Sequence, residues 1–320
     1  MILDYRHAHK IKSTYTDGIL AHVINKKSIS TTWEQCAAAT GRITSSGPNL
    51  QSIPKQEENL TIAGESFNLR KIFVSRLGRK FVAADFQQIE LRVFAHLSLD
   101  KSLISAFQEP GDIFHTMTKI RTGKSDFDPS ERERTKTLMY ALLYGAGSYK
   151  ISELLSVDLE HAKRFCCDFY TSFPGLKSFR ARVLEECRTR KELRSLSGRR
   201  RLFPHIASQN LQQKRYSERQ AVNFVIQGSA ADISKAAMLR AEAALRERHL
   251  QAYLLLQIHD ELLWEVPEEH VMPAIEIIKK AIEETKDYWS VKFNLKVNLP
   301  VKITSGSSWG NMRCEAQPGK

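Results

Sequence analysis

The chain has 320 residues, with 48 Lys and Arg against 36 Asp and Glu, and 42% of its residues are hydrophobic. This composition supports a large buried core and excludes a disordered or low-complexity protein. No run of 18 apolar residues occurs, so we expect no transmembrane helix and no membrane partner. The charged first residues lack the apolar segment of a secretory signal. The five cysteines form no C-x-x-C pair, which favours reduced thiols of an intracellular protein.

In chain order, the predicted elements are a strand at 80–84, helices at 88–99, 130–144, 162–194 and 216–248, strands at 252–258 and 262–266, a helix at 267–287 and a strand at 297–303. Ser130 and Glu133 have the spacing of a capping box. Pro174-Gly175 and Gly228-Ser229 predict breaks in the long helices. The segment 259–261 predicts a hairpin with an acidic tip. The order has no βαβ rhythm and indicates an α+β fold, in which an antiparallel sheet carries a helical insertion.

The positive charge gathers in one stretch. Between Lys177 and Arg219 there are 13 basic and four acidic residues, whereas from Gln251 to the end there are eight basic and ten acidic residues. A basic stretch of this kind is typical of proteins that bind a phosphate-rich partner. A solvated helix face is the alternative interpretation of a charge run.

Three separate segments carry residue types suited to phosphoryl transfer. The first is 85–92, where Asp85 ends a buried strand, and the third is His259-Asp260-Glu261 at the hairpin tip. The second is a series at four-residue spacing along one helix face: Arg132, Lys136, Tyr140 and Tyr144. Singly, each has an ordinary structural explanation. Together they supply carboxylate ligands for divalent cations and a cationic, aromatic helix surface for a nucleotide.

With these segments the sequence closely resembles the family-A (polymerase I-like) DNA polymerases. The matching stretches are LysIleLysSerThrTyr (10–15), ThrGlyArg (40–42) with ProAsnLeuGln (48–51), motif A (85–92), motif B (136–145), GlyArgArgArg (198–201), the run at 218–232, motif C (259–261) and SerTrpGly (308–310). Their order and spacing are those of the family. The run at 218–232, GluArgGlnAlaValAsnPheValIleGlnGlySerAlaAlaAsp, is most similar to the eukaryotic nu and theta branch.

The resemblance implies a right-hand polymerase, whose palm is the antiparallel sheet and whose fingers are the helical insertion. Residues 1–107 would be the end of the thumb and the N-terminal part of the palm, 108–222 the fingers, and 223–320 the C-terminal part of the palm. Most of the thumb is then absent. No exonuclease domain fits, so proofreading is not expected in this chain.

The resemblance also assigns roles. Asp85 and Asp260 would ligate two Mg²⁺ ions, for which Mn²⁺ can substitute, with Glu261 as an auxiliary acid and Lys136 as a catalytic cation. The residues expected at the incoming dNTP are Arg132, Lys136, Tyr140, Tyr144, Glu90 and Gln88. Among them, Glu90 would exclude a ribose 2′-hydroxyl, and we expect the Tyr144 hydroxyl to hold it.

The positions expected at primer–template DNA are Arg42, Asn49, Gln51, Arg219, Asn223, Gln227 and His259. Arg219, Asn223 and Gln227 follow one another at four-residue spacing, so a single α-helix could align them along a minor groove. There, purine N3 and pyrimidine O2 acceptors recur in every base pair.

The chain departs from the family pattern at several places, which include Phe86 for a tyrosine in motif A and Ala141 for a glycine in motif B. Gln87 replaces a serine in motif A, and Tyr140 replaces the phenylalanine of motif B. Phe114 stands where a histidine is expected, with His115 one place later, so either nucleotide binding weakens or His115 takes the role. Thr137 replaces a second lysine typical of the nu branch. These changes concern fidelity and nucleotide choice, and leave the metal and triphosphate residues intact.

The function expected from the resemblance is template-directed addition of dNTPs to a primer 3′-hydroxyl, in DNA repair or translesion synthesis in the nucleus. Repair proteins are expected as partners through regions outside this chain. One alternative is a catalytically weak or inactive nucleic-acid-binding fragment, because the thumb is missing. Another is a single-subunit RNA polymerase, which Glu90 opposes because a ribose-accepting site needs a small residue there.

Overall fold

The computed structural model describes residues 2–25, 27–54, 61–62, 65–66, 68–285 and 295–315. The chain forms two compact units. The first, which we call the sheet unit, comprises residues 1–87, 234–285 and 300–320. The second, the helical unit, comprises residues 88–233 and 286–299. The boundaries at 107/108 and 222/223 stay predictions about where palm and fingers divide.

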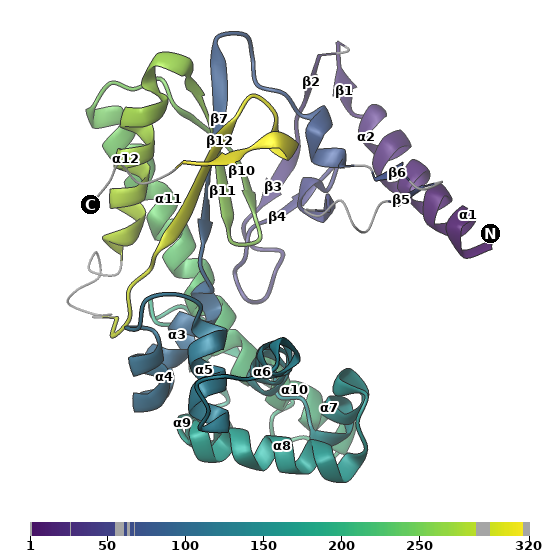
Figure 1. Ribbon diagram of the computed structural model, residues 1–320, viewed down its shortest axis with the longest axis vertical. Coiled ribbons are helices and arrows are strands. Elements are labelled where there is room, and N and C mark those ends of the chain that lie inside the picture. Colours follow the sequence, from purple (N-terminus) through teal and green to yellow (C-terminus); the bar gives the residue numbers. More distant parts are fainter. Residues whose placement is uncertain are drawn as a thin grey trace. The chain divides into compact units, whose positions relative to one another are not determined.

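A five-stranded antiparallel sheet forms the centre of the sheet unit (Figure 1). In spatial order, its strands are β10 (Tyr253–Ile258), β11 (Glu261–Pro267), β7 (Arg79–Phe86), β12 (Val301–Gly306) and β13 (Arg313–Cys314). The central strand β7 has the sequence RKFVAADF, and its residues 81–84 are at most 5% exposed. A strand buried on both faces is typically a continuous apolar run, and in β7 Asp85 interrupts that run just before the last residue of the strand, Phe86.

Different elements pack against the two faces of the sheet. Trp264 and Val82 pair across β11 and β7, so their side chains share a face. On that face, the Trp264 indole donates to Glu242 of α11 (Ser229–Glu247) at 2.8 Å, and α12 (Val271–Glu283) packs against the sheet. On the other face, Phe81, Ala83 and Leu263 join a core with N-terminal residues and Trp309.

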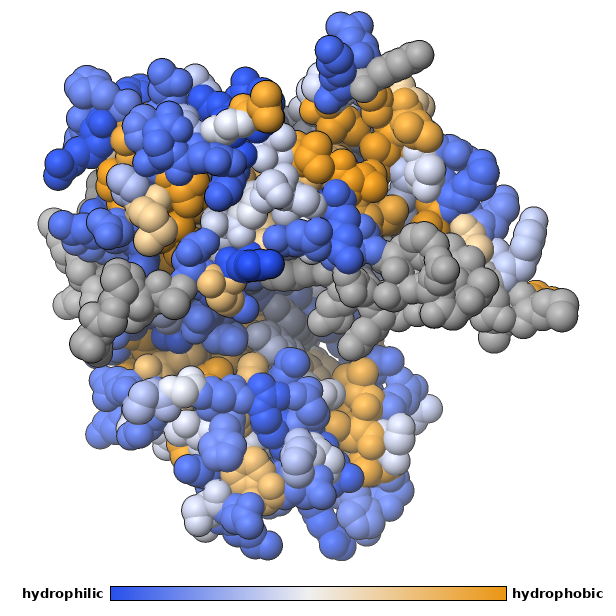
Figure 2. All heavy atoms as spheres, turned by 45° about the horizontal axis from the view of Figure 1, so that its top comes forward, coloured by the Kyte–Doolittle hydropathy of each residue, from blue (hydrophilic) through white to orange (hydrophobic). Residues whose placement is uncertain are grey.

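The remaining elements of the sheet unit are short. They are α1 (Ile2–Lys10), the π-helix η1 (Ile11–Asp17), α2 (Gly18–Leu20), the strand pairs β1 (Val23–Ile24) with β2 (Ser28–Ile29), β3 (Thr32–Glu34) with β4 (Thr44–Ser46) and β5 (Thr61–Ile62) with β6 (Glu65–Ser66), and the 3-10 helices η2 (Leu50–Ser52), η4 (Leu69–Ile72), η6 (Glu268–His270) and η7 (Trp309–Asn311). Figure 2 shows mostly hydrophilic side chains on one face of the molecule, with apolar ones gathered in places. Ile72, Val74 and Leu77 are among the exposed apolar residues of this unit.

The helical unit is built around one apolar core. Its elements are α3 (Ile89–Ser98), α4 (Lys101–Ala106), α5 (Ile113–Thr122), α6 (Pro129–Leu143), α7 (Ser148–Leu155), α8 (Leu159–Ser172), α9 (Gly175–Arg190), the hairpin of β8 (Glu192–Arg194) and β9 (Arg200–Leu202), α10 (Leu211–Asn223) and the π-helix η5 (Phe224–Gly228). Leu138, Met139 and Phe169 are fully buried in this core. Each therefore stabilises the unit by roughly 1.5–3 kcal/mol of apolar burial.

Gly175 fixes one close contact in this unit. Asp100 caps α4 by accepting from Leu103 N at 2.9 Å, and its second oxygen accepts from Gly175 N at 2.7 Å. A Cβ on Gly175 would lie 2.5 Å from the Asp100 Cβ, which is too close for any other residue. The Pro174-Gly175 break therefore lets α9 begin directly against α4.

The predicted fold class is confirmed: an antiparallel sheet is combined with a large helical insertion. The predicted break at 228–229 is present, because the π-helix η5 ends at Gly228 and α11 begins at Ser229. Three local predictions were wrong. Asp128, not Ser130, caps α6, accepting from Ser130 N at 2.7 Å. Residues 192–194 form a strand, and the last long strand begins at Val301. The end of the predicted helix at 286–287 lies outside the described residues.

All five cysteines are free thiols. Burial raises the pKa of Cys187 to about 11, so this thiol is protonated near neutral pH. Within the described ranges, no helix is long and apolar enough to cross a membrane.

Candidate active site

Two acidic residues meet at one end of the sheet. Asp85 is the next-to-last residue of β7, and Asp260 lies in the two-residue turn between β10 and β11. Glu261 pairs in register with Asp85, and Phe86 N–H donates to the Asp260 carbonyl oxygen at 2.9 Å. The pairing of the hairpin with β7 therefore holds the backbones of Asp85 and Asp260 side by side. We call these two the strand-end carboxylates, and both are half-buried.

The strand-end carboxylates fit a magnesium site of a particular kind. Among the described residues, no three or more His, Cys, Asp or Glu side chains are grouped to hold a metal by themselves. Mg²⁺ in nucleotide-handling sites is bound by one or two carboxylates and completes its octahedron with water and substrate phosphates. A pair of carboxylates is therefore a sufficient contribution from the protein when the nucleotide supplies the rest.

Glu261 is held from behind by two residues that the motifs had not marked for the site. The Trp309 indole donates to Glu261 Oε1 at 2.9 Å, and Arg70 NH1 lies 3.4 Å from the same oxygen. Burial lowers the pKa of Arg70, and the carboxylates of Glu261 and Asp85 oppose that shift. Trp309 belongs to the SerTrpGly motif, so a sequence signal existed for it, whereas none pointed to Arg70.

Two predicted contact residues have a left-handed backbone. Gln88 has φ 52° at the start of α3, and His259 has φ 50° beside Asp260. Non-glycine residues rarely adopt this conformation, which concentrates at functional sites because the surrounding structure must enforce it. At Gln88 the turn lets the chain pass from the end of β7 into α3 within three residues.

Helix α6 presents the predicted cationic and aromatic series. Thr135, Leu138 and Met139 are buried on its inner face, whereas Arg132, Lys136, Tyr140 and Tyr144 are half-buried. A buried contact fixes the helix against α5, because Thr118 Oγ1 donates to Thr135 Oγ1 at 2.9 Å and Arg121 Nε donates to it at 3.2 Å. Arg132, Lys136 and Tyr140 thus lie on one half-buried face of α6, and Tyr144 follows them as the C-cap residue of the helix. We call these four residues the α6 stripe.

Carboxylates already pair with both cations of the α6 stripe. Arg132 donates to Asp112 and to Glu133, and Lys136 Nζ lies 3.6 Å from Glu133 Oε2. Burial raises the pKa of Asp112, but the bonds from the Arg132 guanidinium and the Phe114 N–H together outweigh burial, so the pKa of Asp112 is lowered. A triphosphate that binds this stripe has to displace these exposed carboxylates.

The aromatic part of the stripe explains one departure from the family pattern. The Phe114 ring, 3% exposed, lies 5.9 Å from the Tyr140 ring, and Tyr140 stacks on Tyr144 at 6.4 Å and 17°. His115 is exposed and packs on Phe127 at 4.7 Å. Phe114 therefore occupies the side of α5 that faces Tyr140, and His115 faces elsewhere. The idea that His115 takes over a phosphate contact at the stripe has no support in this geometry.

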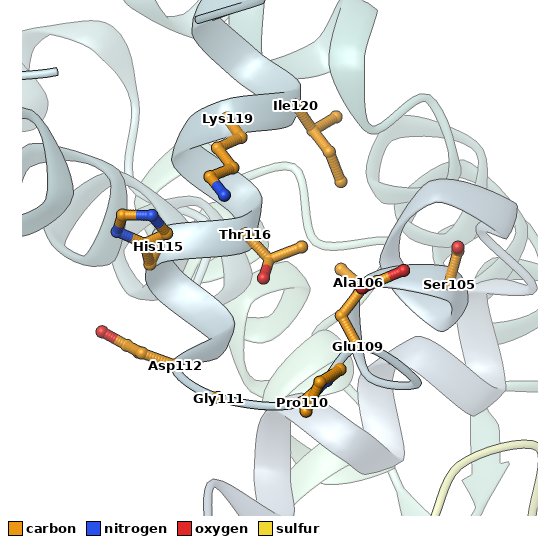
Figure 3. Close-up of a pocket in the computed structure, with 10 residues that line it drawn as sticks. All are labelled: Ser105, Ala106, Glu109, Pro110, Gly111, Asp112, His115, Thr116, Lys119 and Ile120. Atoms are coloured by element: carbon orange, nitrogen blue, oxygen red, sulfur yellow. The ribbon is translucent and has the colours of Figure 1, made fainter. Parts of the chain in front are cut away.

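His115 instead lines a surface pocket of about 520 Å³ between α4 and α5 (Figure 3). Lys119 lies on α5, the helix of His115, and Asp112 is the N-cap residue of that helix. Glu109 and Pro110 lie in the loop that precedes it (Figure 3). Asp112 therefore lines this pocket and also pairs with Arg132 of the α6 stripe. None of the predicted site residues lines the pocket.

The predicted contact between Glu90 and Tyr144 is present. Tyr144 Oη donates to Glu90 Oε2, and Glu90 is only 6% exposed in α3. A buried carboxylate keeps its charge only where donors satisfy it, and the phenol supplies one. Glu90 is consequently held in one position at the start of α3.

The predicted DNA-contact residues of the sheet unit differ in how many hydrogen bonds their side chains already make within the protein. Gln51 Nε2 donates to the backbone oxygens of Ile43 and Gln257 at 3.0 and 2.9 Å, so its amide nitrogen ties the N-terminal loop to β10. Asn49 Oδ1 caps η2 by accepting from Gln51 N at 3.0 Å. Asn49 is exposed and Arg42 is half-buried.

Arg219, Asn223 and Gln227 do not continue along one α-helix. Arg219 is exposed on α10, Asn223 ends α10, and Gln227 lies in the π-helix η5. A π-helix bonds i to i+5, so the straight line predicted from four-residue spacing ends at Asn223. Asn223 Oδ1 is buried and accepts no hydrogen bond from the described residues.

Arg199 holds the π-helix in place. It donates to Asp232 Oδ1 at 3.0 Å and to the Gly228 carbonyl oxygen at 3.1 Å. The Asp232 side chain is only 9% exposed, so this ion pair is shielded from water. Part of the basic stretch is thus structural. Arg188 likewise pairs with Glu218 at 2.7 Å.

A family model of DNA polymerase family A matches residues 1–311 of the chain. The chain belongs to DNA polymerase family A. It is 37% identical over 316 residues to DNA polymerase I of Chloroflexus aurantiacus, covering 97% of this chain and 32% of the relative. It is 40% identical over 314 residues to the thermostable DNA polymerase I of Thermus filiformis, covering 97% and 36%.

A solved structure gives the same result for the fold. The polymerase domain of Pol1 from M. smegmatis, in complex with a DNA primer-template and dNTP, matches with a TM-score of 0.87 and 34% identity. The match covers 96% of this chain and 52% of that one. The chain spans about a third of the length of the curated relatives it matches. Family A DNA polymerases use divalent metal ions, which agrees with the donor set at the strand-end carboxylates.

These relatives correct one expectation. A nuclear location was inferred from similarity to the nu and theta branch, but the relatives that match almost the whole chain are bacterial polymerases. The nuclear prediction is therefore wrong. The comparisons support membership of family A as a whole, without singling out that branch.

Proposed function

We propose that this chain is the part of a family A polymerase that adds dNTPs to a primer 3′-hydroxyl, directed by a template strand. The observation that carries the proposal is the strand register, which places the carboxylates of motifs A and C on neighbouring strand ends. Two-metal phosphoryl transfer needs paired carboxylates at a rigid position.

Asp85 and Asp260 would hold the two Mg²⁺ ions. When bound, these ions supply Lewis-acid activation of the primer hydroxyl and neutralise the leaving pyrophosphate. The sheet contributes rigidity, because the pairing of β7 with β11 and the bond from Phe86 N to the Asp260 carbonyl oxygen hold the backbones of both residues. Glu261 adds a third negative charge that Arg70 balances.

The α6 stripe would bind the incoming nucleotide. Arg132 and Lys136 would exchange their carboxylate partners for triphosphate oxygens, which carry more charge and more acceptors. Tyr140 and Tyr144 offer stacked rings to the sugar and base. Glu90, fixed by the Tyr144 hydroxyl, would occupy the space of a ribose 2′-hydroxyl and so select deoxyribonucleotides.

Primer–template DNA would contact Arg42, Asn49, Arg219 and the exposed cations of α9 and α10. Each neutralised phosphate releases counterion, so DNA affinity should fall steeply with added salt. Gln51 and Asn223 would contribute through the atoms that are not already bonded inside the protein. A role in DNA repair or translesion synthesis without proofreading, and placement in the nu and theta branch, are finer parts of this proposal.

The test is primer extension by the purified chain, with dNTPs and with rNTPs, beside DNA binding measured by fluorescence anisotropy. Asp260→Asn removes one charge without changing size, and Glu276→Gln makes the same kind of change at an exposed position of α12. We expect dNTP-dependent extension by the wild type and Glu276→Gln, and none by Asp260→Asn. Salt-dependent DNA binding without extension by the wild type would favour the nucleic-acid-binding fragment instead.

A further inference from the structure

The SerTrpGly motif at 308–310 has no role in the proposed reaction, yet its tryptophan contacts Glu261, the neighbour of the strand-end carboxylates. Trp309 is 4% exposed, and its indole N–H donates to Glu261 Oε1 at 2.9 Å. Glu261 pairs in register with Asp85 and directly follows Asp260. The Trp309 indole thus helps to hold the carboxylate that is next to Asp260 in the chain and paired with Asp85 in the sheet.

Arg70 contacts the same carboxylate from a second direction. Its guanidinium lies 4.0 Å above the Trp309 ring and 3.4 Å from Glu261 Oε1, with only 5% of its side chain exposed. Arg70 Nε and NH2 donate to the carbonyl oxygens of Pro54 and Ile53, each at 3.2 Å. These backbone contacts fix the guanidinium plane, so Arg70 cannot follow Glu261 if that side chain moves.

Gly310 allows the two residues to meet. A Cβ on Gly310 would lie 2.5 Å from Lys71 N, so only glycine lets η7 approach η4 this closely. Ser308 Oγ donates to the Lys71 carbonyl oxygen at 3.0 Å, and Trp309 N donates to the Phe73 carbonyl oxygen at 3.0 Å. All three residues of the motif therefore attach η7 to the segment that carries Arg70.

We propose that Arg70 and Trp309 form a buried bracket that positions Glu261 and sets the charge behind the strand-end carboxylates. The inference rests on the proposed function, whose metal site it deepens. Trp309 fixes the orientation of Glu261 through a hydrogen bond from its uncharged indole N–H, which adds no charge to the site. Arg70 fixes the same side chain and adds one positive charge, which offsets the mutual repulsion of three neighbouring acids and weakens their attraction for cations.

The two halves of the bracket predict different responses. Arg70→Gln removes the charge, so Mn²⁺ should bind the chain about three- to tenfold more tightly. The same change loosens Glu261, so kcat for nucleotide incorporation should fall by about tenfold. Trp309→Phe keeps the ring and removes only the N–H, so kcat should fall by about three- to tenfold with Mn²⁺ affinity unchanged.

The experiment measures Mn²⁺ binding to the chain alone, from the electron paramagnetic resonance signal of free Mn²⁺, beside kcat and the KM for dNTP. Phe73→Leu is the matched control, because the Phe73 ring packs edge-on against the Trp309 ring at 5.6 Å and its side chain has no polar atom to contact Glu261. It should lower thermal stability while leaving kcat and Mn²⁺ affinity of the folded chain unchanged. Arg70→Lys keeps the charge but not the planar contacts, so it should lower kcat and leave Mn²⁺ affinity near wild type.

Tighter Mn²⁺ binding with slower incorporation in Arg70→Gln supports the bracket, because general structural damage would weaken both. A parallel loss of both, or no change in either, overturns it. If Arg70→Gln does not fold, a lower kcat with unchanged Mn²⁺ affinity in both Trp309→Phe and Arg70→Lys supports the bracket, and an unchanged kcat in both overturns it. A wild type that fails to incorporate dNTPs would contradict the proposed function, whereas the Mn²⁺ affinities would still judge the charge assigned to Arg70.

Discussion

The sheet unit and the helical unit hold their charged side chains in different ways. The strand-end carboxylates are placed by backbone pairing between segments about 175 residues apart, and a buried arginine and tryptophan support Glu261 behind them. The cations of the α6 stripe follow one another along a single helix and pair with exposed carboxylates such as Glu133. The acidic residues at the strand ends are therefore held by the fold, and the charges of the α6 stripe are exchangeable.

This difference suits two tasks. Metal-assisted chemistry needs groups whose positions do not relax as charge develops, because reorganisation raises the barrier. Binding and release of a nucleotide in every cycle needs cations whose partners can be replaced at small cost, and exposed ion pairs contribute only about 0–1 kcal/mol. Substitutions in the two regions should therefore act on different kinetic constants.

The largest effect is expected at the strand ends. Asp85→Ala or Asp260→Ala should lower kcat at least about a thousandfold, because a lost metal clamp costs several kcal/mol of transition-state stabilisation. DNA binding should stay near normal or rise, since a negative charge is removed. Single-turnover extension measures the rate and anisotropy measures the binding. If Asp85→Ala kept more than about a tenth of the rate, the metal assignment would be wrong.

The sequence predicts the placement of charged residues well where they are close together in the chain, and poorly where distant segments have to pair. The α6 stripe could be predicted because helical spacing alone places Arg132, Lys136 and Tyr140 on one face. The hairpin tip at Asp260 and the end of the strand at Asp85 were also predictable from short-range patterns, but their pairing register was not. That register depends on β7 lying between β11 and β12, which no local pattern encodes.

Residues that act through tertiary contacts escaped prediction for the same reason. Arg70 lies in the short 3-10 helix η4, which no local pattern marks, and it meets Trp309 only because Gly310 lets η7 approach. The π-helix η5 forms where α-helical spacing predicted an unbroken face, and Arg199 satisfies its Gly228 carbonyl from another segment. The Glu90–Tyr144 contact was predicted from the family resemblance, not from spacing.

A second prediction tests whether the cations of the α6 stripe act on nucleotide binding rather than on the rate of the reaction. Lys136→Ala should raise the KM for dNTP by about tenfold to a hundredfold, because a charge-assisted bond to phosphate contributes roughly 1.5–3 kcal/mol. The fold of the unit should persist, since Lys136 is half-buried and its partner Glu133 is exposed. Steady-state extension over a range of dNTP concentrations gives both constants. Lys150→Ala is the control, as Lys150 also pairs with a neighbouring glutamate, at 2.8 Å, on α7.

Tyr140 tests how the stripe reads the sugar and triphosphate. A dNTP has a 3′-hydroxyl that can hydrogen-bond its own phosphate oxygens, and a ddNTP does not. We expect the Tyr140 hydroxyl to supply the missing donor, so that the chain uses ddNTPs nearly as well as dNTPs. Tyr140→Phe should then restore discrimination by about tenfold to a hundredfold. Competition between the two nucleotides on one template measures the ratio, and equal ratios in both proteins would show that the hydroxyl has no such role.

Glu90 should give a smaller change in sugar selection. Glu90→Ala opens space near the start of α3 and removes a buried carboxylate, so the ratio of rNTP to dNTP incorporation should rise by about tenfold. Tyr144→Phe, which removes the donor to Glu90 and keeps the ring, should raise the ratio less. Gel-based incorporation of single nucleotides measures both. An unchanged ratio in Glu90→Ala would make Glu90 only a structural partner of Tyr144.

The smallest expected effect concerns stability, and it sharpens the contrast between fixed and exchangeable charges. Glu265 on β11 has only 5% of its side chain exposed, and it accepts from Arg76 N at 2.8 Å and from Arg76 Nε at 2.7 Å. Burial raises the pKa of Glu265, but the Arg76 bonds outweigh it and lower the pKa below its usual 4.5. Because the folded pKa is lowered, the stabilisation is fully present above about pH 4.5 and is lost as pH falls through the folded pKa.

Glu265→Gln should therefore lower the free energy of unfolding by about 1–2 kcal/mol at pH 7, with the difference from wild type shrinking as the pH falls below about 4.5. Urea unfolding followed by tryptophan fluorescence, to which the buried Trp264 and Trp309 contribute, measures it at each pH. Glu268→Gln, at an exposed position just after β11, should change stability by less than about 0.5 kcal/mol at every pH. A Glu265→Gln difference that stayed constant down to pH 3 would mean that the neutral amide fails in shape or hydrogen bonding. In that case the charge of Glu265 would not be what Arg76 stabilises.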